Sequence, residues 1–189
     1  MMIEKKHNLQ APGSGLPTFE NVLIKSVLVP FARLFLGWRS AKLWLDLELR
    51  SIERMVDGLN DAALNKQVLI DHILGIEDDT RDWSVALVIE HLAIVSAGVI
   101  QVVKTLSEER PFDGPISIAA VKPGKNAVTL DELKQIIKDY ETFHPRNRNS
   151  KMTKAHPWFI EFNNRDWNTF LAIHTWVHKR QIKAILRGV

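Results

Sequence analysis

Three of the seven histidines lie at positions where imidazole nitrogens can bind a metal ion. His174 and His178 are four residues apart in a segment with a helical pattern, so their side chains project from one face with Cβ atoms about 6 Å apart. His91 lies on the apolar stripe of another helical segment, the face that a helical bundle turns toward its core. Three neutral imidazoles that leave coordination positions open are typical of a catalytic metal site. A histidine on an apolar stripe can equally be a hydrogen-bonded core residue, and the spacing alone leaves both interpretations open.

The elements that would position these histidines are four amphipathic helices. In each of them apolar residues recur every three or four positions, which is the helical period. Asp82 is the expected N-cap of the helix that carries His91. Thr129 and Glu132 match a capping box at the start of the next helix. The expected helices span residues 39–59, 82–107, 129–144 and 163–188.

This pattern predicts an all-α fold, a four-helix bundle in which the two long connections, 108–128 and 145–162, are crossovers. No segment alternates apolar and polar residues over a convincing length, so we expect no sheet. The expected organisation is an N-terminal tail and apolar arm over residues 1–37, followed by the helical domain over 38–189. Within the first part, residues 1–16 are expected to form a mobile polar tail.

Composition limits the chemistry that this chain can perform. Its 189 residues suffice for one domain of ordinary size, and a hydrophobic share of 46% is that of a globular chain. The chain has no cysteine. Disulfides, iron–sulfur clusters and zinc sites with thiolate ligands are therefore excluded. The same absence is consistent with a reducing, cytoplasmic location.

Positive charge is concentrated at the C-terminal end. Residues 144–189 carry nine Lys/Arg and two Asp/Glu, whereas the preceding 143 residues carry sixteen and twenty. Such a region can meet an anionic substrate or form a solvated cationic face. We expect no nucleic-acid binding, because no DNA- or RNA-reading signature is present. The residues expected to contact an anionic substrate are Arg146, Arg148 and Lys151, in the connection before the last helix.

Residues 19–38 form an unusually apolar arm. Lys25, Arg33 and Pro30 all fall inside it and argue against a membrane-spanning helix. The arm is expected to pack on its own domain or on a second copy of the chain, since left exposed it would be an aggregation patch. Contact with a membrane surface is a less favoured alternative. The competing functional hypothesis is a non-catalytic helical protein that forms a homodimer, or binds a partner, through this arm.

Several short motifs together resemble the DinB/YfiT-like family. The first set is WS at 83–84 followed by EHLA at 90–93. The second is HPWF at 156–159, DW at 166–167 and HTWVHKRQI at 174–182. The resemblance covers roughly residues 40–189 and rests on the order and spacing of these motifs. It implies a four-helix bundle in which His91, His174 and His178 bind a metal. The sequence departs from the family at Ile160, where a glycine is often found, and in its apolar arm.

The resemblance also implies an activity, because characterised members include thiol-dependent transferases and isomerases. A divalent ion, Zn or Ni by expectation, lowers the pKa of a bound water or thiol. The two expected activities on a small-molecule substrate are therefore hydrolysis and thiol transfer, and the thiol has to be a low-molecular-weight cosubstrate because the chain has no cysteine. Gln181, near His178, is expected to form a hydrogen bond with a metal-ligating histidine on the side of the ring that faces away from the metal. No catalytic acid or base is identifiable, since Glu90 points about 100° away from His91.

Overall fold

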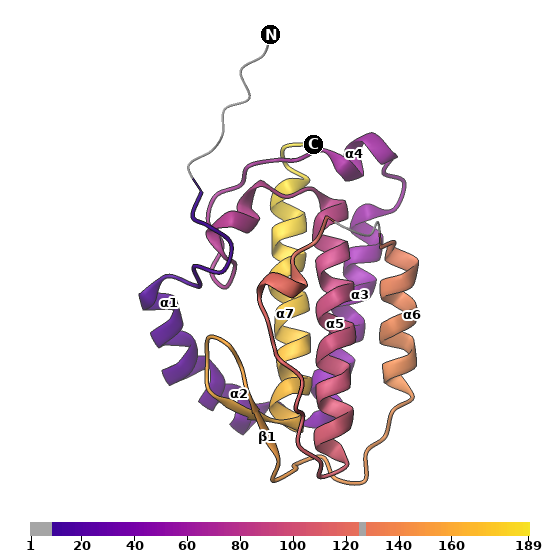
Figure 1. Cartoon of the computed structure of the whole chain (residues 1–189). Helices are drawn as coiled ribbons and strands as arrows, with labels where there is room; N and C mark the ends of the chain where they lie inside the picture. The colour runs from indigo at the N-terminus through magenta and orange to yellow at the C-terminus, as the bar shows by residue number, and fades with distance from the viewer. Residues whose placement is uncertain (1–8, 125–127) are drawn as a thin grey trace.

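The computed structural model describes residues 9–124 and 128–189, and it is mostly helical (Figure 1). The first eight residues of the expected polar tail lie outside the described residues. The elements in chain order are α1 (Thr18–Leu23), a π-helical turn η1 (Ile24–Leu28), α2 (Val29–Phe35), α3 (Trp38–Val56), α4 (Asp61–Asn65), a 3₁₀ turn η2 (Asp78–Asp82), α5 (Val85–Ser107), a 3₁₀ turn η3 (Ala119–Val121), α6 (Leu130–Glu141), strands β1 (Thr153–Ala155) and β2 (Glu161–Asn163), and α7 (Asn164–Ile185).

Four long helices, α3, α5, α6 and α7, lie side by side (Figure 1). Lys134, near the start of α6, forms an ion pair with Glu53, near the end of α3, so these two helices are antiparallel. Asn164, at the start of α7, donates a hydrogen bond to the Ser107 hydroxyl at the end of α5, at 2.9 Å. Helices α5 and α7 are therefore antiparallel as well. As a result, the first turns of α5 lie beside the last turns of α7.

Helix α5 is the core helix of this arrangement. It is long and apolar enough to cross a membrane by length and composition, but 67% of its most apolar stretch is buried against its neighbours. Leu92, Val103 and Leu106 are completely buried, as are Ile52 of α3 and Leu171 of α7. The apolar character of α5 therefore serves to pack the interior, because a helix that is apolar all round is stable in water only when it is enclosed.

The two long connections differ from the predicted pair of crossovers. Residues 108–124 run from the end of α5 back along the helices, and α6 begins at the opposite end of the structure from the end of α5, so this connection is a crossover (Figure 1). The connection between α6 and α7 begins and ends at the same end of the structure, where Asn164 donates to the carbonyl of Asn147. It contains an antiparallel hairpin with Lys154 opposite Phe162. The prediction of no sheet was wrong here, because strands of three residues are too short to show an alternating pattern.

The start of α5 also differs from the prediction. The N-cap is Ser84, whose hydroxyl accepts a hydrogen bond from the backbone N–H of Leu87 at 3.2 Å, and the helix begins at Val85. Asp82 instead ends the 3₁₀ turn η2, and Trp83 is extended. Either side chain can cap a helix, and the chain direction set by η2 decides between them. The capping box of Thr129 and Glu132 is confirmed.

Residues 18–35 form a continuous helical arm along the side of α7 (Figure 1). Pro30 does not break it, because the preceding π turn lets the N–H of Val29 bond to the carbonyl of Ile24 while the proline lies near the start of α2. Arg33 donates two hydrogen bonds to Asp166 of α7, at 3.0 and 2.6 Å. The arm therefore packs on its own domain, which is one of the alternatives predicted from the sequence.

Candidate metal centre

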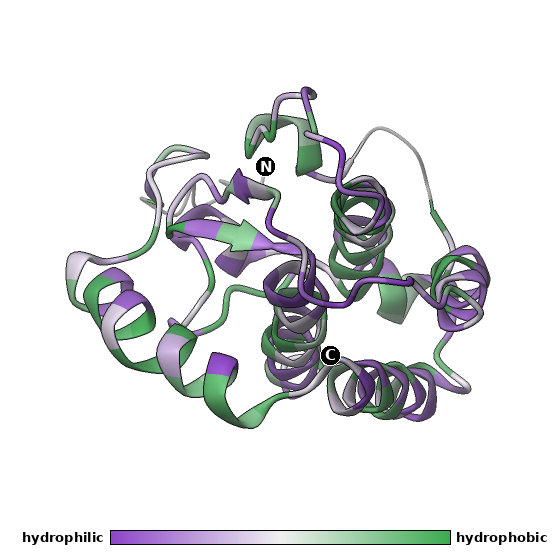
Figure 2. Cartoon of the chain, turned by 90° about the horizontal axis from the view of Figure 1, so that it is seen from below, coloured by the Kyte–Doolittle hydropathy of each residue, from purple (hydrophilic) through white to green (hydrophobic). Residues whose placement is uncertain are grey.

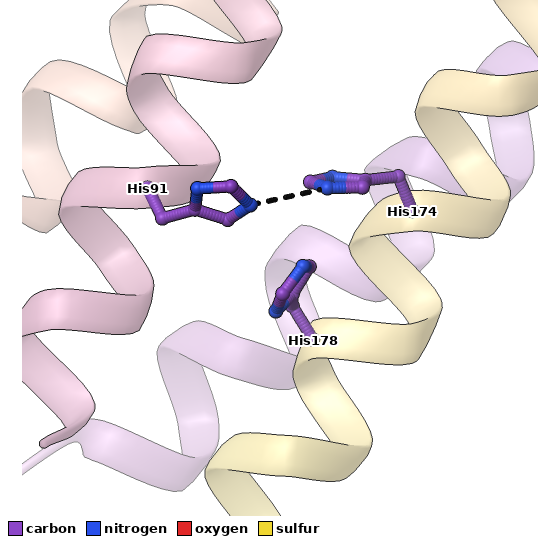
Figure 3. Close-up of side chains that lie close together, drawn as sticks. All are labelled: His91, His174 and His178. Carbon is purple, nitrogen blue, oxygen red and sulfur yellow. Dashed lines mark hydrogen bonds between the residues drawn. The ribbon is translucent and has the colours of Figure 1, made fainter. Parts of the chain in front are cut away.

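Antiparallel packing of α5 and α7 brings three histidines together between the two helices (Figure 3). His91 lies about 9 Å from the start of α5, and His178 lies about 10 Å from the end of α7, so the two are at the same level. His174 is one turn from His178 on the same helix face. One ring nitrogen from each residue lies within 4.8 Å of the other two, and among the described residues no other such group of histidines or carboxylates is present.

The distances suit a small divalent cation. The Nε2 atoms of His91 and His174 are 3.2 Å apart. Two imidazole nitrogens on a tetrahedral zinc ion, each about 2.05 Å from the metal, would be separated by about 3.3 Å. The three rings lie with their centroids 4.4–5.1 Å from one another and are tilted rather than stacked. These side chains could therefore hold a metal ion with little rearrangement.

Hydrogen bonds fix the orientation of two of the rings. The Nδ1 of His91 lies 2.8 Å from the carbonyl oxygen of Val121, which can only accept, so this nitrogen carries the proton. The Nδ1 of His178 lies 2.6 Å from Oε1 of Gln181. The Gln181 amide in turn donates to the carbonyl of Thr80 at 2.7 Å, which directs its oxygen at the histidine. In both rings the lone pair is therefore on Nε2, the arrangement that metal-ligating histidines adopt, and Nε2 of His91 forms a hydrogen bond with Nε2 of His174 in this structure (Figure 3).

Burial keeps these imidazoles neutral. Burial lowers the pKa of His91 to about 4, with a further contribution from the positive charge of Lys122. Burial also lowers the pKa of His174 and of His178 well below the usual value, and the neighbouring histidines add to this effect. At neutral pH all three lone pairs are available, so no proton has to leave before a cation binds.

The predicted anion-binding residues lie elsewhere. Arg146, Arg148 and Lys151 are exposed in the connection before α7, at the end of the structure where α5 terminates. That end is about 24 Å along α5 from His91. Arg148 lines a shallow groove beside the start of α3. The structure therefore brings the three histidines and Gln181 together but does not bring these three cations to them.

A different cation, Lys122, lies near the histidines. Its amine is 5.7 Å from the centre of the Trp83 ring and forms ion pairs with Glu77 and Asp79 at 2.5 and 2.8 Å. Lys122 follows directly after Val121, whose carbonyl holds His91. No periodic signal could have revealed it, because it lies in the irregular crossover, about thirty residues from the histidine that it approaches.

Two further titratable residues, Glu90 and His156, lie near the triad but are not part of it. Glu90 is buried and accepts a hydrogen bond from the N–H of Gly124 at 2.9 Å, away from the three histidines. His156 is stacked on Phe159 at 4.4 Å and also packs against Phe170, whose ring centroid is 5.3 Å from that of His174. His156 is therefore part of an aromatic cluster behind the triad.

Comparisons with known proteins found no match to this chain among protein-family models, among curated proteins or among solved structures. The geometry of the three histidines and their hydrogen-bond partners is therefore the basis for assigning a function.

Gln181 offers a direct test of how the triad is supported. The variant Gln181→Met should bind zinc about 10 to 100 times more weakly than the wild type, because His178 loses the acceptor that fixes its proton on Nδ1. Zinc affinity would be measured by competition with a chromophoric chelator. Gln135→Met, on the exposed face of α6, is the matched control and should leave the affinity unchanged. Equal affinities for the Gln181→Met and wild-type proteins would contradict this role.

His156 should make folding stability depend on pH. Burial lowers its pKa to about 3 in the folded state, whereas the unfolded chain takes up a proton near pH 6.5. The unfolded state therefore binds more protons below pH 6.5, and stability falls as the pH is lowered through this range. Between pH 7 and 5 this residue should account for a loss of about 2 kcal/mol.

The variant His156→Phe preserves the aromatic packing and should lose less stability between pH 7 and 5 than the wild type. Urea unfolding at the two pH values, in chelator throughout, would measure the difference. The exposed His144→Gln variant serves as control and should behave like the wild type. If wild type and His156→Phe lost the same stability over this range, the assignment would be wrong.

Proposed function

We propose that this protein is a metal-dependent enzyme that uses His91, His174 and His178 to bind one divalent ion, Zn or Ni. The observation that carries the proposal is the convergence of three neutral ring nitrogens within 4.8 Å, two of them oriented by partners on the far side of the ring. We also propose that α3, α5, α6 and α7, which lie side by side, form a four-helix bundle, the fold that the resemblance to the DinB/YfiT-like family implies.

When bound, such an ion supplies Lewis acidity and lowers the pKa of a coordinated water or thiol. The protein residues then determine what reacts. His91 and His178 keep their Nε2 lone pairs directed at the ion through Val121 and Gln181. Phe170, whose ring centroid lies 5.3 Å from that of His174, covers part of this side of the triad. A reaction class that fits is transfer of a low-molecular-weight thiol to a small electrophile, with hydrolysis as the alternative.

Lys122 is the residue that we assign to anion attraction in place of the distant Arg146, Arg148 and Lys151. Its charge already acts on His91 and His178, since it lowers the pKa of both. The amine also pairs with Glu77 and Asp79, so their charges partly offset its attraction for a thiolate, a hydroxide or a substrate carboxylate near the triad. In this proposal Arg146, Arg148 and Lys151 are solvent-exposed surface residues that have no role at the site. We propose a cytoplasmic location, with which the absence of cysteine is consistent.

Metal content is the first test. Untagged protein purified without chelator or nickel resin should contain close to one equivalent of metal by elemental analysis, and the His174→Ala/His178→Ala double variant should contain none. A His72→Ala/His144→Ala variant is the matched control, since these two histidines lie outside the triad. The absence of metal from the wild-type protein, together with a failed zinc titration, would overturn the proposal.

The outer face of the arm supports a second candidate function, formation of a homodimer. Phe19, Leu34 and Phe35 are 74%, 77% and 67% exposed, and Figure 2 shows how much of the arm is hydrophobic. Their neighbours Val22, Val27 and Phe31 are exposed too. An apolar surface of this extent with few charges suits a second copy of the chain better than an anionic membrane, which attracts basic helices.

Light scattering on the purified protein tests this second candidate. The wild type should have twice the monomer mass, and Leu34→Glu/Phe35→Glu should have the monomer mass, because each substitution places a charge at the centre of the apolar contact. Lys25→Glu, on the same arm, controls for the change in charge. A monomeric wild-type protein at high micromolar concentration would contradict dimer formation.

A further inference from the structure

A narrow apolar cavity lies between the helical arm and α7. Its volume is about 380 Å³, which is within the range of small-molecule sites. The walls are aliphatic and aromatic, and include Leu28, Ala32, Trp44, Phe170, Ile173 and Val177. The cavity is partly open to solvent, so a ligand can enter it, and its walls are mostly apolar.

The cavity meets the histidine triad at His174. This residue forms part of its wall, whereas His91 and His178 do not. On α7, Phe170, Ile173 and Val177 face the arm and His178 faces α5, so His174 lies at the boundary between the two faces. His174 is also the one member of the triad that is partly exposed. A molecule lying in the cavity can therefore have one end next to the metal ligands.

The charged side chains and the buried polar atoms of the wall already have partners, with one exception. Arg33 and Asp166 are paired with each other, and Arg165 donates to the carbonyl oxygens of Arg33 and Leu36. Because these charges are already paired, they do not favour a charged ligand along the cavity. The exception is Nδ1 of His174, which is enclosed and has no hydrogen-bond partner among the described residues. The unsatisfied polar character is thus at the end of the cavity that adjoins the triad.

The shape of the cavity indicates a chain rather than a compact molecule. Its lining on α7 extends from Arg165 to Val177, about 18 Å along the helix. Dividing the volume by this length gives a mean cross-section of about 21 Å². The arm holds this shape because Arg33 anchors one end to Asp166, and Glu20 anchors the other through His72 and the N–H of Gly75.

We propose that this cavity binds the unbranched acyl or alkyl chain of the substrate and places the polar, reactive end of that molecule at the triad. The inference rests on the proposed function for the role of the triad, but the chain-binding cavity is a property of the arm and α7. The inner face of the arm is then a substrate wall, and Phe31 belongs both to this wall and to the exposed outer face. The substrate class that follows is a small amphiphile with a single hydrocarbon chain.

Binding of hexanoate, octanoate and decanoate to the full-length protein tests the proposal. Isothermal titration calorimetry would be carried out on zinc-loaded wild type and on the metal-free His174→Ala/His178→Ala variant. We expect affinity to rise about fourfold for each added methylene in both proteins. We also expect the zinc-loaded protein to bind each acid more tightly than the variant does, since the carboxylate lies next to the metal site.

Variants of the arm locate the binding. Ala32→Phe fills the cavity from the arm and should weaken decanoate binding at least tenfold. Leu34→Phe, on the outer face of the same helix, is the matched control and should bind normally. If Ala32→Phe does not fold by circular dichroism, Ile173→Phe fills the same cavity from α7 and should have the same effect.

The outcomes separate this inference from the proposed function. Affinity that grows with chain length in both proteins, with no gain from zinc, would support the cavity and count against the metal-dependent function. Stoichiometric zinc binding with no dependence on chain length would leave the function standing and overturn the cavity proposal. Normal decanoate binding by a folded Ala32→Phe or Ile173→Phe protein would overturn it as well.

Discussion

The antiparallel contact between α5 and α7 is the constraint on which the candidate site depends. It places the second turn of a very apolar helix beside the last turns of a more polar one, and so encloses three imidazoles in one layer. Burying an imidazole is tolerable only while it is neutral and its N–H has a partner. The fold meets both conditions for His91 and His178, because burial lowers the pKa of each ring and an oxygen atom accepts from each Nδ1.

The groups that orient the histidines come from the irregular connections and not from the four long helices alone. The crossover between α5 and α6 supplies the carbonyl of Val121 and the charge of Lys122. The segment before α5 supplies the carbonyl of Thr80, which fixes Gln181. These segments lie along the helix pair at the level of the histidines, so their paths are constrained by the hydrogen bonds that they make there. A site built in this way requires these connections as well as α5 and α7, because the two helices alone do not contain all of its supports.

Much of this arrangement is readable in the sequence, and the remainder has identifiable physical causes. Helical periodicity predicted the four long helices, and the spacing of His174 and His178 predicted that they share a face. Periodicity carries no information about non-helical segments, which is why Lys122 and the hairpin around Phe162 were missed. Asp82 and Ser84 are equally good caps by type, and only the turn before them decides which one is used. The exposed cations before α7 were assigned by charge alone, and charge does not indicate at which end of a helix a connection lies.

The arm illustrates how one amphipathic segment can acquire two roles. Its polar anchors, Glu20 and Arg33, point toward the domain, where Glu20 binds near Gly75 and Arg33 binds Asp166. Phe19, Leu34 and Phe35 are mostly exposed, so they do not fill the space against α7, whereas Phe31 lines that space although it is also exposed. An arm that served only as packing would place those side chains inward, since burial of apolar area is the main source of stabilisation. Because these side chains lie on the outside, a cavity remains beside His174 and the outer surface of the arm is apolar. The size of the candidate site therefore depends on the arm, a segment that precedes the four long helices.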